Sequence, residues 1–222
     1  MKALLKIEKL GFCDLRQGSW VLQGVDLIIN PGEIRVIYGG VGSGKTTLVE
    51  LISGFKQPTR GRIERTEAYA VVAQEFDLYP DLTVAENLDF LSLINHSKVK
   101  GRQFLLSRYG LDGWERTRAI QLPGALKKML QLAAAGRQEF ELLVMDEPTV
   151  GLDLDLRRKF SEAVKELKGL GKGILILTAN EADLALGEQV LELKNGTLSE
   201  NSLAPSLSDD SLLETGGSDN ER

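Results

Sequence analysis

The sequence contains little cysteine and few aromatic residues, and it lacks long apolar runs. The single Cys13 among 222 residues excludes an internal disulfide and favours a reducing compartment. Aromatic residues make up only 6% of the chain, and no run approaches the roughly 18 apolar residues of a membrane-spanning helix. Lys2 and Lys6 interrupt the N-terminus before an apolar stretch develops, so we expect no signal peptide. The sequence therefore predicts a cytoplasmic protein.

Net charge is also small and is confined to one end of the chain. Residues 199–222 hold six acids and one base, and this difference equals the net charge of -5 for the whole chain. A neutral body lacks the basic footprint of a nucleic-acid binder, so we expect no nucleic-acid partner. We expect residues 199–222 to form an acidic, disordered tail. Its role is open between solubility and docking on a basic surface of a partner.

Apolar runs and helical spacings alternate along residues 1–198. Strand-like runs occupy residues 25–29 and 34–38, and continuous apolar runs occupy residues 142–145 and 174–177. Helical spacing occupies residues 45–53, about 84–137, and 156–167. Strands buried on both faces are typical of parallel sheets. The pattern predicts an α/β fold with a β-rich start and a helical insertion.

A glycine-rich segment lies between the expected strand 34–38 and the expected helix 45–53. It matches the pattern G-x-x-x-x-G-K-[ST] and comprises Gly39, Gly40, Val41, Gly42, Ser43, Gly44, Lys45, Thr46 and Thr47. Glycines let backbone N–H groups wrap a phosphate closely, and the following helix directs its positive end at the same anion. Lys45 would neutralise phosphate charge, and Thr46 would coordinate Mg²⁺. The alternative is a glycine-rich turn with a chance lysine.

Two carboxylates follow the apolar run 142–145. Asp146 would hold Mg²⁺ through its water shell, and Glu147 would orient and deprotonate an attacking water. Parallel sheets open toward their ligand at the carboxyl ends of the strands, where these acids fall. The alternative is a solvated strand end with ordinary acids.

With these two motifs, residues 4–198 resemble the ATP-binding-cassette (ABC) ATPases. Residues 51–61 are similar to the helix and turn after the phosphate loop, and residues 72–88 to the Q-loop region and the entry to the helical subdomain. Residues 146–153 match the Walker B motif and D-loop. The sequence of residues 78–88 is most similar to that of ATPase subunits of export-type transporters. The resemblance implies a P-loop NTPase of ABC type, with a mixed or parallel sheet core, an N-terminal antiparallel β region and a helical subdomain inserted at about 84–137.

The resemblance also implies roles for single residues. Gln74 would reach Mg²⁺ and the attacking water. The implied metal-binding residues are therefore Thr46, Gln74 and Asp146. The implied catalytic residues are Lys45, Gln74 and Glu147. Asp153 would lie at the interface of two nucleotide-binding domains. Taken alone, Gln74 is also compatible with a surface amide and Asp153 with a helix N-cap.

The chain departs from the family at the signature segment, which is usually LSGGQ. Here the segment consists of Leu122, Pro123, Gly124, Ala125 and Leu126. Pro123 removes a hydroxyl donor to the γ-phosphate of an ATP bound in trans, although proline at a helix start preserves the helix. Ala125 adds a Cβ where the family keeps glycine. We expect weaker ATP-driven closure, and an ordinary helix start would also explain these residues.

Two further departures concern catalysis and the adenine base. Ala179 stands where the family has a switch histidine; Asn180 could bind a phosphate or water but carries no proton as imidazole does. The only histidine, His96, is expected in an exposed loop. Asp14 stands nearest to the usual adenine-stacking aromatic, so Trp20 is the candidate stacking residue, whereas Phe12 is expected in the core.

The resemblance implies an ATP-binding subunit of an ABC transporter with ATP and Mg²⁺ as cofactors. Slow hydrolysis would drive a conformational change in a transmembrane permease, on the inner face of the cell membrane. A second ABC ATPase is expected as partner, with a heterodimer favoured over a homodimer. The alternative is a regulatory or structural ATP-binding module with little or no hydrolysis. A soluble ABC protein acting on ribosomes or DNA repair fits a single cassette poorly.

Overall fold

The computed structural model describes residues 2–14, 18–73, 78–94, 101–135 and 140–200 of the chain. The strands are β1 (Leu5–Asp14), β2 (Ser19–Ile29), β3 (Ile34–Tyr38), β4 (Arg60–Arg65), β5 (Tyr69–Val72), β6 (Leu142–Asp146), β7 (Gly173–Thr178), β8 (Gln189–Lys194) and β9 (Thr197–Glu200). The α-helices are α1 (Lys45–Ser53), α2 (Val84–Ile94), α3 (Arg102–Arg108), α4 (Gly124–Ala135) and α5 (Leu154–Gly169). Two 3₁₀ segments, η1 (Ala119–Gln121) and η2 (Glu181–Leu186), complete the described elements.

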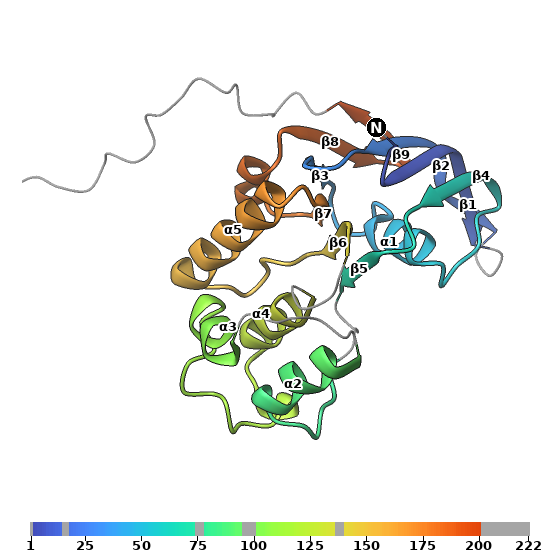
Figure 1. Ribbon diagram of the computed structural model, residues 1–222. Coiled ribbons are helices and arrows are strands. Elements are labelled where there is room, and N and C mark those ends of the chain that lie inside the picture. Colours follow the sequence, from blue (N-terminus) through green and yellow to red (C-terminus); the bar gives the residue numbers. More distant parts are fainter. Residues whose placement is uncertain (1, 15–17, 74–77, 95–100, 136–139, 201–222) are drawn as a thin grey trace, which may run out of the picture.

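The central sheet has the strand order β5-β6-β7-β3-β8-β9 (Figure 1). Its strands pair in parallel from β5 to β8, and only β9 is antiparallel to its neighbour β8. The register places Thr178 opposite Tyr38, and Asp146 opposite Leu177. The carboxyl ends of β3, β6 and β7 therefore meet at one edge, which confirms the predicted parallel core.

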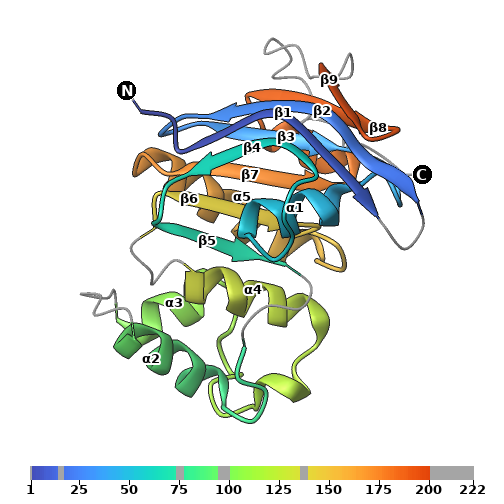
Figure 2. The ribbon, with the colours of Figure 1, turned by 90° about the vertical axis from the view of Figure 1, so that its right-hand side faces the viewer.

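The first strands form a separate antiparallel sheet in the order β2-β1-β4. Alternate residues of β2 from Val25 to Ile29 are buried, which is typical of a strand with one face on the core. Figure 2 shows α1 between this sheet and the central one. The predicted N-terminal antiparallel β region is confirmed.

Two hydrophobic clusters cover opposite faces of the central sheet. On β7, Leu175 and Leu177 belong to the cluster with α1 and the antiparallel sheet, whereas Ile174 and Ile176 belong to the cluster with α4 and α5. Successive side chains of a strand point to opposite faces, so a continuous apolar run is needed when both faces are covered. This explains why residues 174–177 contain no polar residue.

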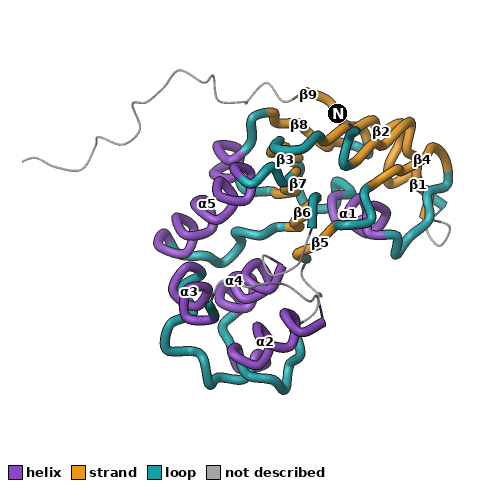
Figure 3. The backbone as a smooth tube through the Cα atoms, viewed as in Figure 1, coloured by secondary structure: helices purple, strands orange, loops and turns teal. Residues whose placement is uncertain are grey.

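Helices α2, α3 and α4 form a group of their own beside β5, the edge strand of the central sheet (Figure 3). They lie within the range 84–137 that was expected to be helical. At the other end of the chain β9 extends to Glu200, so the expected tail boundary at residue 199 was wrong by two residues. Within the described part of the chain, no helix has both the length and the apolar character needed to cross a bilayer.

Candidate active site

The phosphate loop connects the carboxyl end of β3 to the start of α1. Gly42 and Gly44 have positive φ angles of 78° and 106°, which glycine adopts readily and other residues rarely. A Cβ on Gly39 would lie 2.6 Å from Ser43 Oγ and 2.7 Å from the carbonyl oxygen of Leu193. Helix α1 has no side-chain cap and no acid in its first turn. Its N-terminal amides and positive dipole end are therefore suited to an anion.

Lys45 is folded inward from the first residue of α1. Its side chain is 7% exposed, and Nζ donates hydrogen bonds to the carbonyl oxygens of Gly39 (2.7 Å) and Gly40 (3.0 Å). The same Nζ lies 3.2 Å from Oε1 of Glu147. A buried ammonium with such partners is held at the mouth of the loop, where a phosphate oxygen would need a cation.

Thr46 and Asp146 meet across the site although they are 100 residues apart in the sequence. The Thr46 hydroxyl donates to Oδ2 of Asp146 at 2.8 Å. Asp146 is 4% exposed, and burial raises the pKa of its carboxyl above the usual value; the Thr46 bond partly opposes this, while Glu147 adds to it. The charges of Lys45 and Lys128 lower this pKa as well, but burial outweighs them, so the ionised carboxylate is disfavoured in the free protein.

Two buried oxygens near the loop fit a Mg²⁺–nucleotide complex. Among the described residues, Asp146 Oδ1 and Ser43 Oγ have no hydrogen-bond partner. Buried polar atoms are rarely left in this state. Mg²⁺ prefers oxygen ligands and keeps several waters, so one hydroxyl and one carboxylate are an adequate protein contribution. The donors present thus suit the metal, with Thr46 and Asp146 as its protein contacts.

Glu147 is held in an unusual backbone conformation at the end of β6. Its φ is 48°, in the left-handed region, which costs about 1–3 kcal/mol for a residue other than glycine. Its N–H donates to the carbonyl of Leu177 at 2.8 Å, and its Oε2 accepts from the N–H of Ala179 at 3.0 Å. The carboxylate is thereby aimed at Lys45 and the phosphate loop, where a general base is needed.

A buried carboxylate that sequence reasoning missed connects the loops after β6 and β7. Asp183 is 2% exposed and accepts hydrogen bonds from the hydroxyls of Thr149 (2.6 Å) and Thr178 (2.7 Å). Thr178 Oγ1 also lies 3.4 Å from Glu147 Oε2, but its single hydrogen serves the shorter contact. Asp183 thus fixes both loops around Glu147. No local pattern marks this residue, because Thr149 lies 34 residues away.

At the position of the family's switch histidine, only the backbone of Ala179 contacts Glu147. The neighbouring Asn180 caps η2 by accepting from the N–H of Ala182 at 3.2 Å, and its amide nitrogen lies 3.5 Å from Thr149 Oγ1. The amide oxygen of Asn180 thus serves its own segment and its amide nitrogen faces the loop after β6, and contact of Asn180 with a phosphate stays a prediction.

The degenerate signature segment does begin a helix. Leu122 is extended (φ -66°, ψ 143°), as the residue before a proline should be. The Pro123 carbonyl accepts from the N–H of Lys127 at 3.0 Å, and α4 starts at Gly124. Leu122 and Leu126 are buried, whereas Pro123 and Gly124 are exposed. The expected survival of the helix is confirmed, with exposed residues at its first turn.

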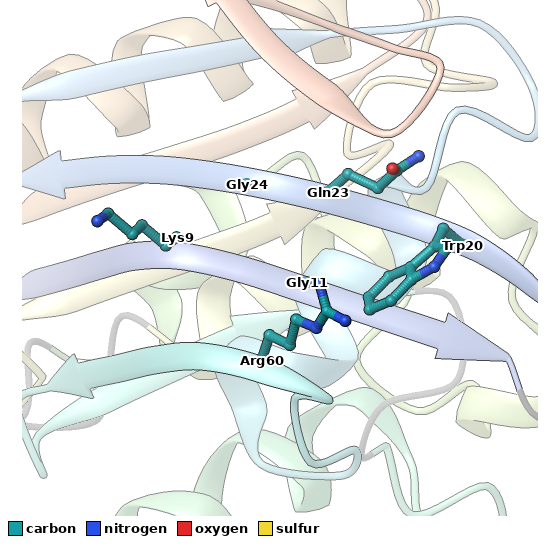
Figure 4. A pocket seen from close by; sticks show the side chains of 6 residues that line it. All are labelled: Lys9, Gly11, Trp20, Gln23, Gly24 and Arg60. Atoms are coloured by element: carbon teal, nitrogen blue, oxygen red, sulfur yellow. The ribbon is translucent and has the colours of Figure 1, made fainter.

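Trp20 lies on the antiparallel sheet in a shallow hollow of about 320 Å³ (Figure 4). The lining residues are Lys9, Gly11, Trp20, Gln23, Gly24 and Arg60, and none of them belongs to the phosphate loop. The Arg60 guanidinium lies 4.8 Å from the indole centroid. The next two residues, Val21 and Leu22, do approach the loop, since a Cβ on Gly44 would lie 3.4 Å from Val21 Cγ1 and 2.9 Å from Leu22 Cδ2. Adenine stacking on Trp20 stays a prediction.

The remaining predicted residues divide into two groups. Gln74 and His96 lie outside the described residues. Asp153 caps α5 by accepting from the N–H of Leu156 at 2.9 Å, and Phe12 packs against the core cluster that contains α1. The N-cap interpretation of Asp153 is therefore confirmed, and Phe12 is partly buried at the edge of the core.

The chain belongs to the ABC transporter family, whose model matches residues 22–150. An ABC transporter ATP-binding protein of Methanopyrus kandleri is 33% identical over 90% of this chain and 82% of its own length. A ribose import ATP-binding protein of Streptomyces avermitilis is 34% identical over 95% of this chain, but the match covers 44% of that relative. The chain thus spans less than half of this longer relative. ATP hydrolysis is the general activity of ABC cassettes.

Solved structures show the same fold. The ATP-binding subunit of an ABC transporter superposes with a TM-score of 0.77 at 24% identity, covering 88% of both chains. A dimeric bacterial ABC transporter cassette also gives 0.77, at 23% identity, covering 87% of this chain and 96% of that one. Among the sequence relatives, a macrolide export protein of Chromobacterium violaceum is 30% identical over 83% of this chain and 32% of its own length. Importers and exporters thus both match. The similarity of residues 78–88 to export-type subunits therefore does not assign this chain to either class.

Proposed function

We propose that this chain is an ATP-hydrolysing subunit of an ABC transporter. The observation that carries the proposal is the meeting of four side chains, Lys45, Thr46, Asp146 and Glu147, at the carboxyl ends of β3 and β6. Each has the chemistry that its place requires: a cation, a hydroxyl, a metal-binding carboxylate and a general base. Membership of the ABC family supports the same conclusion.

In this proposal the phosphates of ATP bind the amides of residues 39–47 and the ammonium of Lys45. Thr46 and Asp146 hold Mg²⁺, which when bound neutralises charge on the phosphates. Glu147 takes the proton of the attacking water, a role that typically contributes about 10²–10⁴ in rate. Gln74 as a further contact to the metal and the water is part of the proposal and rests on the resemblance alone.

ATP turnover by the proposed complex is expected to be slow, because two residues each lack a group that the family has at that position. Pro123 offers no hydroxyl to the γ-phosphate of an ATP in a partner site. Ala179 contributes only its backbone N–H to Glu147, where the family has an imidazole. Both losses remove hydrogen bonds that would stabilise the reacting state.

The proposed partners are a transmembrane permease and a second ABC ATPase, at the inner face of the cell membrane. ABC cassettes share each ATP between the phosphate loop of one chain and the signature segment of another. A different ATPase with an intact signature would supply the serine that Pro123 replaces, which favours a heterodimer. In a homodimer both sites would lack it.

Phosphate release by the complex with its permease tests the activity. The wild-type chain should release phosphate at a measurable rate. Lys45→Ala should abolish this release, and Glu147→Gln should reduce it to a small residual rate. Glu147→Gln should still bind ATP, because its phosphate loop is intact. Equal rates for all three proteins would overturn hydrolysis and favour the regulatory ATP-binding module.

Size-exclusion chromatography tests the pairing. The Glu147→Gln chain alone should stay monomeric with and without Mg²⁺–ATP, and should pair only when a second ATPase with an intact signature is added. A clear ATP-dependent homodimer would contradict the heterodimer.

A further inference from the structure

Lys128 connects the signature helix to the general base. It lies in the second turn of α4 and is partly buried. Its Nζ donates hydrogen bonds to the backbone carbonyl of Glu147 at 2.6 Å and to that of Val150 at 2.9 Å. These carbonyls are 19 and 22 residues away in the sequence, so the contacts join two separate parts of the fold.

The contact with Glu147 falls on a residue whose backbone is held in the left-handed region. Glu147 has a φ of 48°, and its N–H is bonded to Leu177. With Lys128 on its carbonyl, both backbone groups of Glu147 are held from neighbouring elements. This fixes the direction in which the carboxylate leaves the backbone, toward Lys45 Nζ and Ala179 N–H.

Burying the Lys128 ammonium costs desolvation free energy, which indicates that its charge has a role at this position. Burial lowers the pKa of Lys128, and the acids Glu147, Asp146 and Asp183 around it oppose this effect. A methionine of similar length would fill the space without paying for desolvation. Lys127, its partly buried neighbour on the same helix, offers a matched comparison.

We propose that Lys128 is a positioning residue for ATP hydrolysis, holding Glu147 in its working conformation and linking it to the start of α4. This inference rests on the proposed function, with Glu147 as general base. Because α4 begins at the signature segment, a movement of residues 122–126 on contact with a partner's nucleotide is passed through Lys128 to the backbone of Glu147. Lys128 itself needs no contact with ATP.

Steady-state phosphate release by the full complex is the test, with the variants Lys128→Met, Lys128→Arg and Lys127→Met. Lys128→Met should lower kcat by about 10- to 100-fold with an unchanged KM for ATP, since a displaced base impairs only the reaction step. Lys128→Arg should restore much of kcat, because guanidinium also donates to carbonyls. Lys127→Met should resemble the wild type.

A double variant separates positioning from general support of the fold. In a Glu147→Gln background, Lys128→Met should cause no further fall in the residual rate, because the group being positioned is already gone. A further fall, a wild-type kcat for Lys128→Met, or an equal loss in Lys127→Met would overturn the proposal. If the wild type is no faster than Glu147→Gln, the proposed function fails instead.

Discussion

The hydroxyl of Thr46 and the carboxylate of Asp146 form a 2.8 Å hydrogen bond that joins the phosphate loop to the end of β6. Thr46 occupies one carboxylate oxygen, and Oδ1, the other, is buried with no hydrogen-bond partner among the described residues. Burial raises the pKa of this carboxyl. The site therefore carries an electrostatic cost in the free protein that a bound cation relieves.

Asp146→Asn should stabilise the free protein and abolish its response to Mg²⁺–ATP. A raised pKa in the folded state means that the fold favours the neutral acid, so this contribution is lost as pH rises from the ordinary value of 3.8 through the raised pKa. Asparagine remains neutral, so Tm at pH 7 should increase, and the gain should shrink toward pH 3.8. Thermal unfolding with and without Mg²⁺–ATP measures both effects.

The exposed Asp112→Asn is the matched control for this measurement and should leave both Tm and the ligand response as in the wild type. A decrease in Tm at pH 7 for Asp146→Asn would show that the carboxylate is not under the electrostatic cost described.

Gly44→Ala should destabilise the fold by about 1–3 kcal/mol, because alanine rarely adopts a φ of 106°. The added Cβ would also lie 2.9 Å from Leu22 Cδ2. Gly169→Ala, at the end of α5, has open space at its Cβ position and should be neutral or stabilising by up to about 1 kcal/mol. Denaturant unfolding compares the two, and equal effects would be inconsistent with backbone strain in the loop.

Pro123→Ser should strengthen the ATP-dependent association of two cassettes. A hydrogen bond to a charged group contributes about 1.5–3 kcal/mol, which corresponds to about 10- to 150-fold in affinity. Pro123→Ala removes the ring without adding a hydroxyl, and serves as control. Association of chains that also carry Glu147→Gln can be followed by analytical ultracentrifugation. If serine and alanine behave alike, the missing hydroxyl is not what weakens closure.

Glu8 should contribute to stability against acid. Hydrogen bonds from Arg62 and Lys6 lower the pKa of its carboxyl from 4.5 to about 2. A lowered pKa contributes stability above pH 4.5 that is lost as pH falls toward 2. Glu8→Gln should therefore have a lower Tm at pH 7, with a difference that fades over this interval and in high salt. A constant difference at every pH would exclude the ion pair as its cause.

Several parts of this fold were predictable because their physical causes are local. The helix expected at residues 45–53 coincides with α1, since glycine precedes it and its apolar residues have helical spacing. The apolar runs at 34–38, 142–145 and 174–177 form β3, β6 and β7, because strands covered on both faces contain few polar residues.

Other features depend on contacts between distant segments, which no local pattern encodes. Asp183 and Lys128 bond to groups 34 and 19 residues away, so neither differs in its sequence context from an ordinary surface acid or base. Trp20 and Arg60 lie on the same face of the antiparallel sheet, and this face determines where the indole lies. An irregular register in β1 and β2 makes that face hard to assign from alternation alone.

The amino-acid order alone thus establishes the phosphate loop, the paired acids of residues 146–147 and the altered signature, since each consists of neighbours along the chain. Folding adds the relations among them: Thr46 with Asp146, Lys45 with Glu147, and Lys128 with the backbone of Glu147. The reason is physical, because an electrostatic contact depends on distance in space and burial. Parallel strand pairing brings residues 100 positions apart to within a hydrogen bond.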